Sequence, residues 1–198
     1  MKRYMLLVPC LLILAAVALS ACGGGGGSDD EGKIEEAIET AATTSNPSNC
    51  TELETQKFDE QNTSVEGAAA VKECEKEAKN GEDEPAESVD IANVSVNGET
   101  ATAEVALSGG ALNGQSLEVA LEKEGDNWKL DEIVGFTNFD GAKLAETLEE
   151  KFTEEGDVPP KMASCIVKAF AQASQAEAEE LLFSGNLEAV EEVALKCQ

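Results

Sequence analysis

The stretch VSVNGETATAEV, residues 94–105, decides the fold class. Asn97-Gly98 is the strongest short sequence signal for a tight β-hairpin. On the far side of this turn, small or apolar side chains alternate with polar ones, which is the period of a strand with one buried face. The pattern predicts two antiparallel strands, over residues 89–96 and 100–107.

Two more strands are predicted downstream of this hairpin. Residues 117–122 again alternate between apolar and acidic side chains, and Gly125-Asp126-Asn127 turns the chain into a run that contains Trp128 and Leu130. Four strands joined by tight turns form an antiparallel meander. One face of this sheet is apolar and needs a cover, which preceding helices can supply.

Helical periodicity precedes the strands. Apolar residues from Ile34 to Ala42 predict a first helix, which Ser45-Asn46-Pro47 ends. We expect residues 46–64 to form a loop with a turn of helix around Leu53–Phe58, and Thr63 with Glu66 to form a capping box. That box predicts a second helix over about 65–79. The acidic run around Pro85 lacks the spacing of an EF-hand loop and is predicted to be a solvated turn.

Helical patterns also follow the strands. A helix is predicted over about 141–154, and a Gly/Pro-rich breaker at 156–160 separates it from a final helical segment that includes a second capping box, Ser174 with Glu177. The predicted fold is therefore α+β, with N-terminal helices packed on a four-stranded antiparallel meander and a small C-terminal helical appendage. The predicted domains span 33–154 and 155–198.

The N-terminus carries a targeting signal. Lys2 and Arg3 precede an apolar run, so residues 1–21 are predicted to be a secretory signal peptide, too short to stay as a membrane span. Leu19-Ser20-Ala21-Cys22 resembles the lipobox of bacterial lipoproteins, which implies that Cys22 is lipidated and becomes the first mature residue. This implies an exported protein held on the outer face of the cytoplasmic membrane, or in an outer membrane where the host has one. The alternative is an ordinary signal peptide that contains a cysteine. Residues 22–32 are predicted to be a flexible tether with a reach of roughly 15–20 Å.

Cysteine usage fits an exported protein. Cys10 lies in the signal peptide that is removed, and Cys22 is the predicted lipidation site. The four remaining cysteines predict two disulfides. Of the three pairings, we favour those in which each pair flanks a helical segment, Cys50–Cys74 and Cys165–Cys197. A four-thiolate zinc site is the alternative, but it calls for C-x-x-C spacing, which this chain lacks.

Composition excludes several chemistries. The chain has 14 basic and 40 acidic residues, no histidine, and a single arginine, Arg3 in the signal. Catalysis by Ser-His-Asp or Cys-His groups and histidine–zinc sites are therefore excluded. The net charge of −26 argues against nucleic acid as a partner and favours a solvated, repulsive surface, with a salt-adapted host as a second explanation. No cofactor and no metal is predicted.

The motifs VSVNGETATAEV and LEVALEKEGDNWKLDEI (117–133), preceded by helices and a Cys50…Cys74 pair, resemble nuclear-transport-factor-2-like (cystatin-like) domains of bacterial lipoproteins. The resemblance covers about residues 34–135. The helical tail resembles an appendage of related actinobacterial lipoproteins. The resemblance implies a cone-like curved sheet wrapped over helices, often around a pocket. The family's enzymes place Asp/His or Tyr/Asp groups in the cone; with no histidine and only Tyr4, in the signal, no catalytic residue carries over.

Three residues are candidates for a pocket in such a cone. Trp128, Phe136 and Asp131 could line its mouth, although Trp128 and Phe136 are better explained as core and Asp131 as a solvent-facing carboxylate. We expect a non-enzymatic binding or interaction module of the cell envelope, with a protein or small-molecule partner. The alternative is a carboxylate-dependent lyase, isomerase or hydrolase with its active site in the cone.

Overall fold

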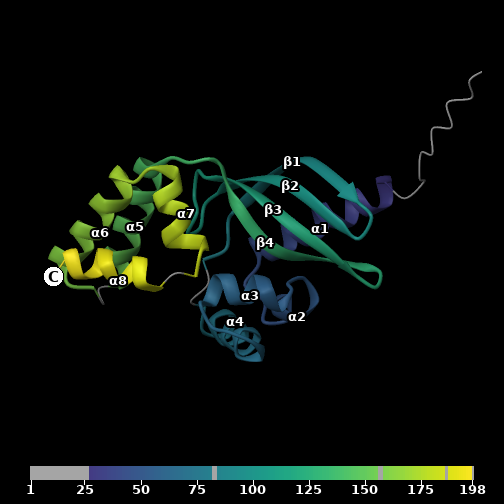
Figure 1. Ribbon diagram of the computed structural model, residues 1–198, viewed down its shortest axis with the longest axis horizontal. Coiled ribbons are helices and arrows are strands. Elements are labelled where there is room, and N and C mark those ends of the chain that lie inside the picture. Colours follow the sequence, from purple (N-terminus) through teal and green to yellow (C-terminus); the bar gives the residue numbers. More distant parts are fainter. Residues whose placement is uncertain (1–26, 82–83, 156–157, 186, 198) are drawn as a thin grey trace, which may run out of the picture.

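A computed structural model of the chain describes residues 27–81, 84–155, 158–185 and 187–197. The predicted signal peptide and lipobox, with Cys22, lie outside these residues. The architecture is α+β, as predicted: within the described part, a group of helices, a four-stranded sheet and a second group of helices follow one another along the chain (Figure 1). Within the same ranges, every helix is too short or too polar to cross a bilayer.

The N-terminal helices are α1 (Gly27–Thr43), α2 (Asn49–Glu52), α3 (Gln56–Thr63) and α4 (Ala68–Asn80). The strands are β1 (Ser88–Asn97), β2 (Thr100–Ser108), β3 (Ser116–Glu124) and β4 (Asn127–Asn138). The C-terminal helices are α5 (Gly141–Glu155), α6 (Pro160–Gln172), α7 (Gln175–Phe183) and α8 (Leu187–Lys196). Figure 1 shows α5–α8 gathered at one end of the molecule and α2–α4 beside β4.

The sheet is the predicted antiparallel meander in the order β1-β2-β3-β4. Asn97 is the last residue of β1 and pairs with Thr100, so the central residues of the turn are Gly98 and Glu99, one position later than the Asn-Gly pair. Gly98 has a φ of 68°, which glycine adopts without strain. The period-two pattern sets which side chains face inward. Inward-facing residues of β2 and β3 are almost fully buried, and they are Ala101, Ala103, Val105, Leu117, Val119 and Leu121.

Apolar side chains fill the space behind the sheet. Trp128 is 2% exposed and packs in one cluster with Ile34 and Ile38 of α1 and Ala178 of α7. Helix α1 therefore covers the sheet as predicted, whereas α4 packs chiefly on α3. Because Ala178 belongs to this cluster, α7 shares the core of the sheet.

Helix α1 begins at Gly27, so the last residues of the predicted tether, 27–32, are helical. Asp29 and Asp30 lie in its first turn, where carboxylates stabilise the positive end of the helix dipole. Asp30 also accepts hydrogen bonds from Lys123 Nζ at 2.7 Å and Trp128 Nε1 at 3.1 Å. These contacts with β3 and β4 stabilise the first turn of α1, which the glycine-rich sequence alone does not predict to be helical.

The prediction for residues 46–66 was wrong in two respects. The segment contains two helices, α2 and α3, where a single turn around Leu53–Phe58 was expected, and Thr63 ends α3 instead of starting the next helix. Ser64 follows in the left-handed conformation, with a φ of 56°, and Gly67 precedes α4. The misassignment arose because Thr63-Ser64-Val65-Glu66 has the residue types of a capping box but lies where one helix stops and the chain reverses.

The capping box in the C-terminal helices is present as predicted, with Ser174 and Glu177 each satisfying the other's backbone N–H. The disulfide Cys165–Cys197 joins α6 to the residue after α8, as predicted. Helix α7 covers the outer edge of β4, where Glu179 accepts a hydrogen bond from Phe136 N at 2.9 Å. The expected cap of α8, Asn186, lies outside the described residues.

Candidate functional site

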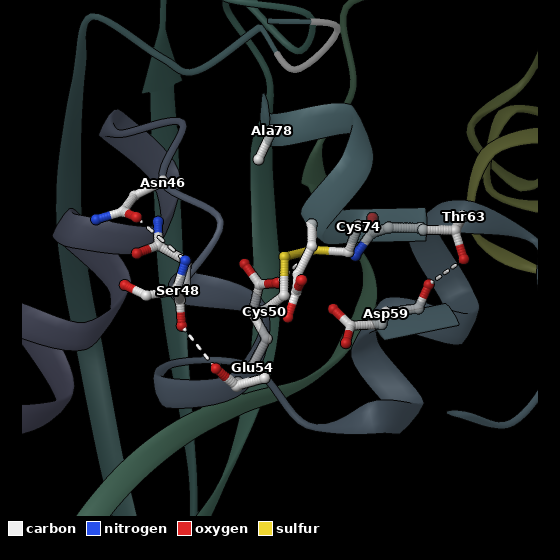
Figure 2. The surroundings of a disulfide bond; sticks show 12 residues. Asn46, Ser48, Cys50, Glu54, Asp59, Thr63, Cys74 and Ala78 are labelled. Atoms are coloured by element: carbon white, nitrogen blue, oxygen red, sulfur yellow. Dashed lines mark hydrogen bonds between the residues drawn. A yellow bond between two sulfur atoms is a disulfide. The ribbon is translucent and has the colours of Figure 1, made fainter. Parts of the chain in front are cut away.

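The disulfide Cys50–Cys74 is formed as predicted and joins α2 to α4 (Figure 2). Its two Cα atoms are 6.1 Å apart, and Cys50 is 3% exposed. The short helix α2 is oriented for this link by Asn49, whose side-chain amide donates to Thr44 O at 3.0 Å. The disulfide therefore fixes α4 against the chain segment that leaves α1.

A cavity of about 310 Å³ lies beside this disulfide. Its walls come from the end of α1, from α2, α3 and α4, and from the segment that precedes β1. The lining is mixed, with about as much apolar as polar surface. The carboxylates are Glu54, Asp59, Glu77 and Glu84, and the side-chain amides are Asn46, Asn49 and Asn62.

Asp59 is the most deeply buried of these carboxylates, with 1% of its surface exposed. Neither of its carboxyl oxygens has a hydrogen-bond partner. Because buried polar groups are normally paired, this carboxyl group calls for an explanation, and a bound ion or ligand is one. Helix α3 holds Asp59 in place: Thr55 accepts a hydrogen bond from Phe58 N at 3.3 Å as the N-cap and donates its backbone N–H to Leu130 O of β4 at 2.9 Å.

Burial raises the pKa of Asp59 to about 6, because the ionised form loses its hydration. The negative charge of Glu75 acts in the same direction. The nearby carboxyl group of Glu54, which can share a proton with Asp59, and the positive charge of Lys129 act against the rise. Since two ionised carboxylates have no proton to donate, Glu54 becomes a partner for Asp59 only when one of the two is protonated.

Glu54 and Asp59 converge with the disulfide. One carboxylate oxygen from each, together with Cys50 Sγ and Cys74 Sγ, form a group in which all four atoms lie within 4.8 Å of one another. Figure 2 shows Asp59 on the side of α3 that faces the disulfide. Chemically, this wall can accept hydrogen bonds, bind positive charge and, in the carboxyl pair, hold a proton.

The candidates named from the sequence lie elsewhere. Trp128 is in the core and also borders an open groove beside α1 and α2. Phe136 is 5% exposed and packs against Phe139 and Phe183 with ring centroids 4.9 Å apart in each pair. Asp131 accepts a hydrogen bond from Thr55 Oγ1 at 2.9 Å and pairs with Lys57 Nζ at 3.0 Å. None of these three residues lines the cavity.

Sequence reasoning missed Glu54 and Asp59. Both lie in the polar segment that was expected to form a loop, where a carboxylate is ordinarily solvated. The one local signal was the predicted disulfide, because its two cysteines had to bring part of that segment against a helix. The acidic turn before β1 contributes Glu84, which pairs with Lys151 Nζ at 3.3 Å in addition to lining the cavity.

Comparisons with models of protein families, with curated proteins and with solved structures find no match to this chain. The α+β fold is established by the structure itself. The likeness to nuclear-transport-factor-2-like lipoproteins stays a prediction from the motifs of the sequence.

Proposed function

We propose that this protein is an exported lipoprotein, anchored through an acylated Cys22, that acts as a non-enzymatic binding module of the cell envelope. We further propose that its ligand-binding site is the acidic cavity beside Cys50–Cys74, and that the ligand is a small molecule bearing a positively charged amine. The observation that supports this binding site is the Asp59 carboxyl group, which is buried in the wall of that cavity and has no hydrogen-bond partner.

The chemistry of the wall supports a cationic ligand. Asp59, Glu54 and Glu77 accept hydrogen bonds when ionised, and an ammonium group offers up to three N–H donors. A charged donor would offset the cost of burying Asp59, which is large for an uncompensated carboxylate. A volume of about 310 Å³ is at the small end of the range for ligand pockets, so the ligand is small.

Two features support export and anchoring. Two disulfides are typical of proteins that fold outside the reducing cytosol. The lipobox-like sequence at 19–22 precedes a glycine run, which would separate the folded part from the membrane surface.

The second candidate function is catalysis by carboxylates as a lyase, isomerase or hydrolase. The convergence of Glu54 and Asp59 on one cavity wall favours it, because paired carboxyls can divide the roles of acid and base. Binding is preferred because the cavity lies outside the sheet's interior, where the resemblance would place a catalytic site, and that interior is filled by side chains such as Trp128.

Titration calorimetry with matched probes tests the proposed binding site. We expect 1,4-diaminobutane to bind the mature chain and 1,4-butanediol, its uncharged counterpart, to bind at least tenfold more weakly. Asp59→Asn should weaken diamine binding by about tenfold, the effect of losing one charge-assisted hydrogen bond. Asp90→Asn, an exposed carboxylate on β1, is the control and should leave binding unchanged. Equal binding of the two probes, or no effect of Asp59→Asn, would contradict the assignment of the binding site to this cavity.

Mass spectrometry of protein from native membranes tests the anchor and the alternative function. The N-terminal peptide should begin at an acylated Cys22; a peptide that begins at Met1, or at an unmodified Cys22, contradicts the lipoprotein proposal. Small molecules that co-purify should be recovered unchanged after incubation with the protein. Conversion of such a molecule to a product, and its loss in Asp59→Asn, would favour the enzyme.

A further inference from the structure

The four atoms that converge at the first disulfide are two sulfurs and two carboxylate oxygens, from Cys50, Cys74, Glu54 and Asp59. Among the described residues, this is the one group of cysteine and acidic side chains close enough together to hold a metal ion. The second disulfide, Cys165–Cys197, has no such group around it in the described part of the chain.

The oxidised form leaves this group incomplete as a metal site. Disulfide sulfurs carry no charge, and thiolates are the form in which cysteine binds metals. Asp59 is nevertheless 1% exposed, lines the cavity and lacks a hydrogen-bond partner, so the wall already holds a desolvated ligand oxygen. What the oxidised wall lacks is the pair of negatively charged sulfurs beside it.

We propose that reduction of Cys50–Cys74 converts this wall into a site for a thiophilic divalent cation such as Zn²⁺, bound by the two thiolates and by one oxygen each from Glu54 and Asp59. This goes beyond the proposed function, which concerns the oxidised chain and an organic cation. The protein would then be a redox-controlled metal-binding protein, with the disulfide as the element that closes the site.

The reduction balances with a dithiol as the reductant. One thiolate of the dithiol attacks a sulfur of Cys50–Cys74, and the mixed disulfide is resolved by the dithiol's second sulfur. Two electrons and two protons pass to the protein, the S–S bond breaks, and the reductant leaves as its own disulfide. On metal binding, the two thiols release their protons to solvent, and so does any protonated carboxyl group among the ligands.

The spacing of the four atoms suits a tetrahedral ion. With Zn–S bonds of about 2.3 Å and Zn–O bonds of about 2.1 Å, neighbouring ligand atoms lie about 3.4–3.8 Å apart. The four ligand atoms here lie within 4.8 Å of one another, so the carboxylate oxygens are already near this range. The two sulfurs are bonded to each other in the disulfide and must move apart to about 3.8 Å once it is reduced. The ligands come from three short elements, α2 with its following turn, α3 and α4, and the cavity provides the entry path.

Binding of Co²⁺, a spectroscopic substitute for Zn²⁺, tests the proposal on the full mature chain. After reduction by a dithiol under anaerobic conditions, we expect one Co²⁺ to bind with the visible bands of a tetrahedral thiolate site, and one Zn²⁺ to displace it. The oxidised chain should bind Co²⁺ at least 100-fold more weakly. Absence of the bands in the reduced chain, or equal affinity in both states, overturns the proposal.

Variants assign the ligands. Cys50→Ser/Cys74→Ser should abolish the thiolate bands, and Asp59→Asn should weaken binding at least tenfold. Cys165→Ser/Cys197→Ser, the matched control, should bind like the parent chain. If the bands follow Cys165 and Cys197 instead, the assignment is wrong.

Folding is monitored by circular dichroism in every sample. If the reduced chain loses structure, Zn²⁺ should restore it, because metal binding and folding are coupled; failure to restore it also overturns the proposal. Diamine binding by the oxidised chain is measured separately, so failure of one proposal leaves the other standing.

Discussion

The space behind the sheet and the cavity beside the first disulfide differ in whether the most deeply buried polar group has a hydrogen-bond partner. Behind the sheet, the one polar atom of Trp128, Nε1, donates to Asp30 at 3.1 Å, and the surroundings are apolar. Beside the disulfide, Asp59 is equally buried but has no partner. The comparison indicates that the sheet supplies stability, while the α2–α4 layer holds a buried carboxyl group without a hydrogen-bond partner, which stability alone does not explain.

The largest predicted effect tests the sheet side of this comparison. Trp128→Ala should lower the free energy of unfolding by about 3–5 kcal/mol, because it removes the largest side chain of a filled core. Urea denaturation followed by circular dichroism measures the change. Val134→Ala, at a β4 position that is 52% exposed, is the control and should change stability by less than about 0.5 kcal/mol. Similar losses in the two variants would mean that the core is elsewhere.

Removal of either disulfide should have the next largest effect. The bridged cysteines are 24 and 32 residues apart, so loop entropy predicts a loss of about 3.5 kcal/mol for each. Denaturation of Cys50→Ser/Cys74→Ser and Cys165→Ser/Cys197→Ser measures both losses. A distinctly smaller loss of stability on removing Cys50–Cys74 would mean that the helices around the cavity depend less on their disulfide than α6 and α8 depend on theirs.

Asp59 should make stability fall as pH rises. Its pKa is about 6 in the folded chain and about 3.9 when unfolded, so the folded state binds the proton more tightly. The resulting stabilisation is complete below pH 4 and is lost as pH rises through 6, by about 3 kcal/mol in total. Relative to Asp59→Asn, the parent chain should therefore become less stable between pH 4 and pH 8.

Urea midpoints across this pH range check the Asp59 prediction. Asp90→Asn, at an exposed position on β1, corrects for the loss of one surface charge. A parent chain that keeps a constant stability difference from Asp59→Asn over the whole range would show that Asp59 is ionised without penalty and that the contrast with the sheet is absent.

The smallest predicted effect concerns Gln61, which lies on the same helix as Asp59 and is fully paired. Its amide donates to Ile133 O at 2.9 Å and Phe183 O at 3.0 Å, and it accepts from Ile133 N at 2.7 Å. Gln61→Ala should cost about 1–2 kcal/mol, because buried backbone groups lose their partner. Thermal melting measures it, with the exposed Gln56→Ala as control. No loss would indicate that α3 is held to β4 by other contacts.

The sequence was sufficient for the sheet because its signals are local. Asn97-Gly98 specifies a turn, and alternation then assigns each strand residue to a face. The two disulfides followed from compartment and spacing. Helices α2 and α3 were not predictable in this way, since their polar sequence has little apolar periodicity, and they are secured by backbone hydrogen bonds between Leu53 or Thr55 and Leu130 of β4. The candidate site was missed for the same reason, because the burial of Asp59 depends on those distant contacts.

The two edges of the sheet bear on how this protein behaves when many copies are crowded together. At β4, Gln61, Gln175 and Glu179 occupy backbone groups that another strand would need. At β1, Asn93 interrupts the pairing with β2 in a left-handed conformation, with a φ of 54°, and bends the strand. Covered and bent edges are poor templates for adding strands from neighbouring molecules. Dense packing on a surface should therefore leave the copies as separate particles and not as fibres.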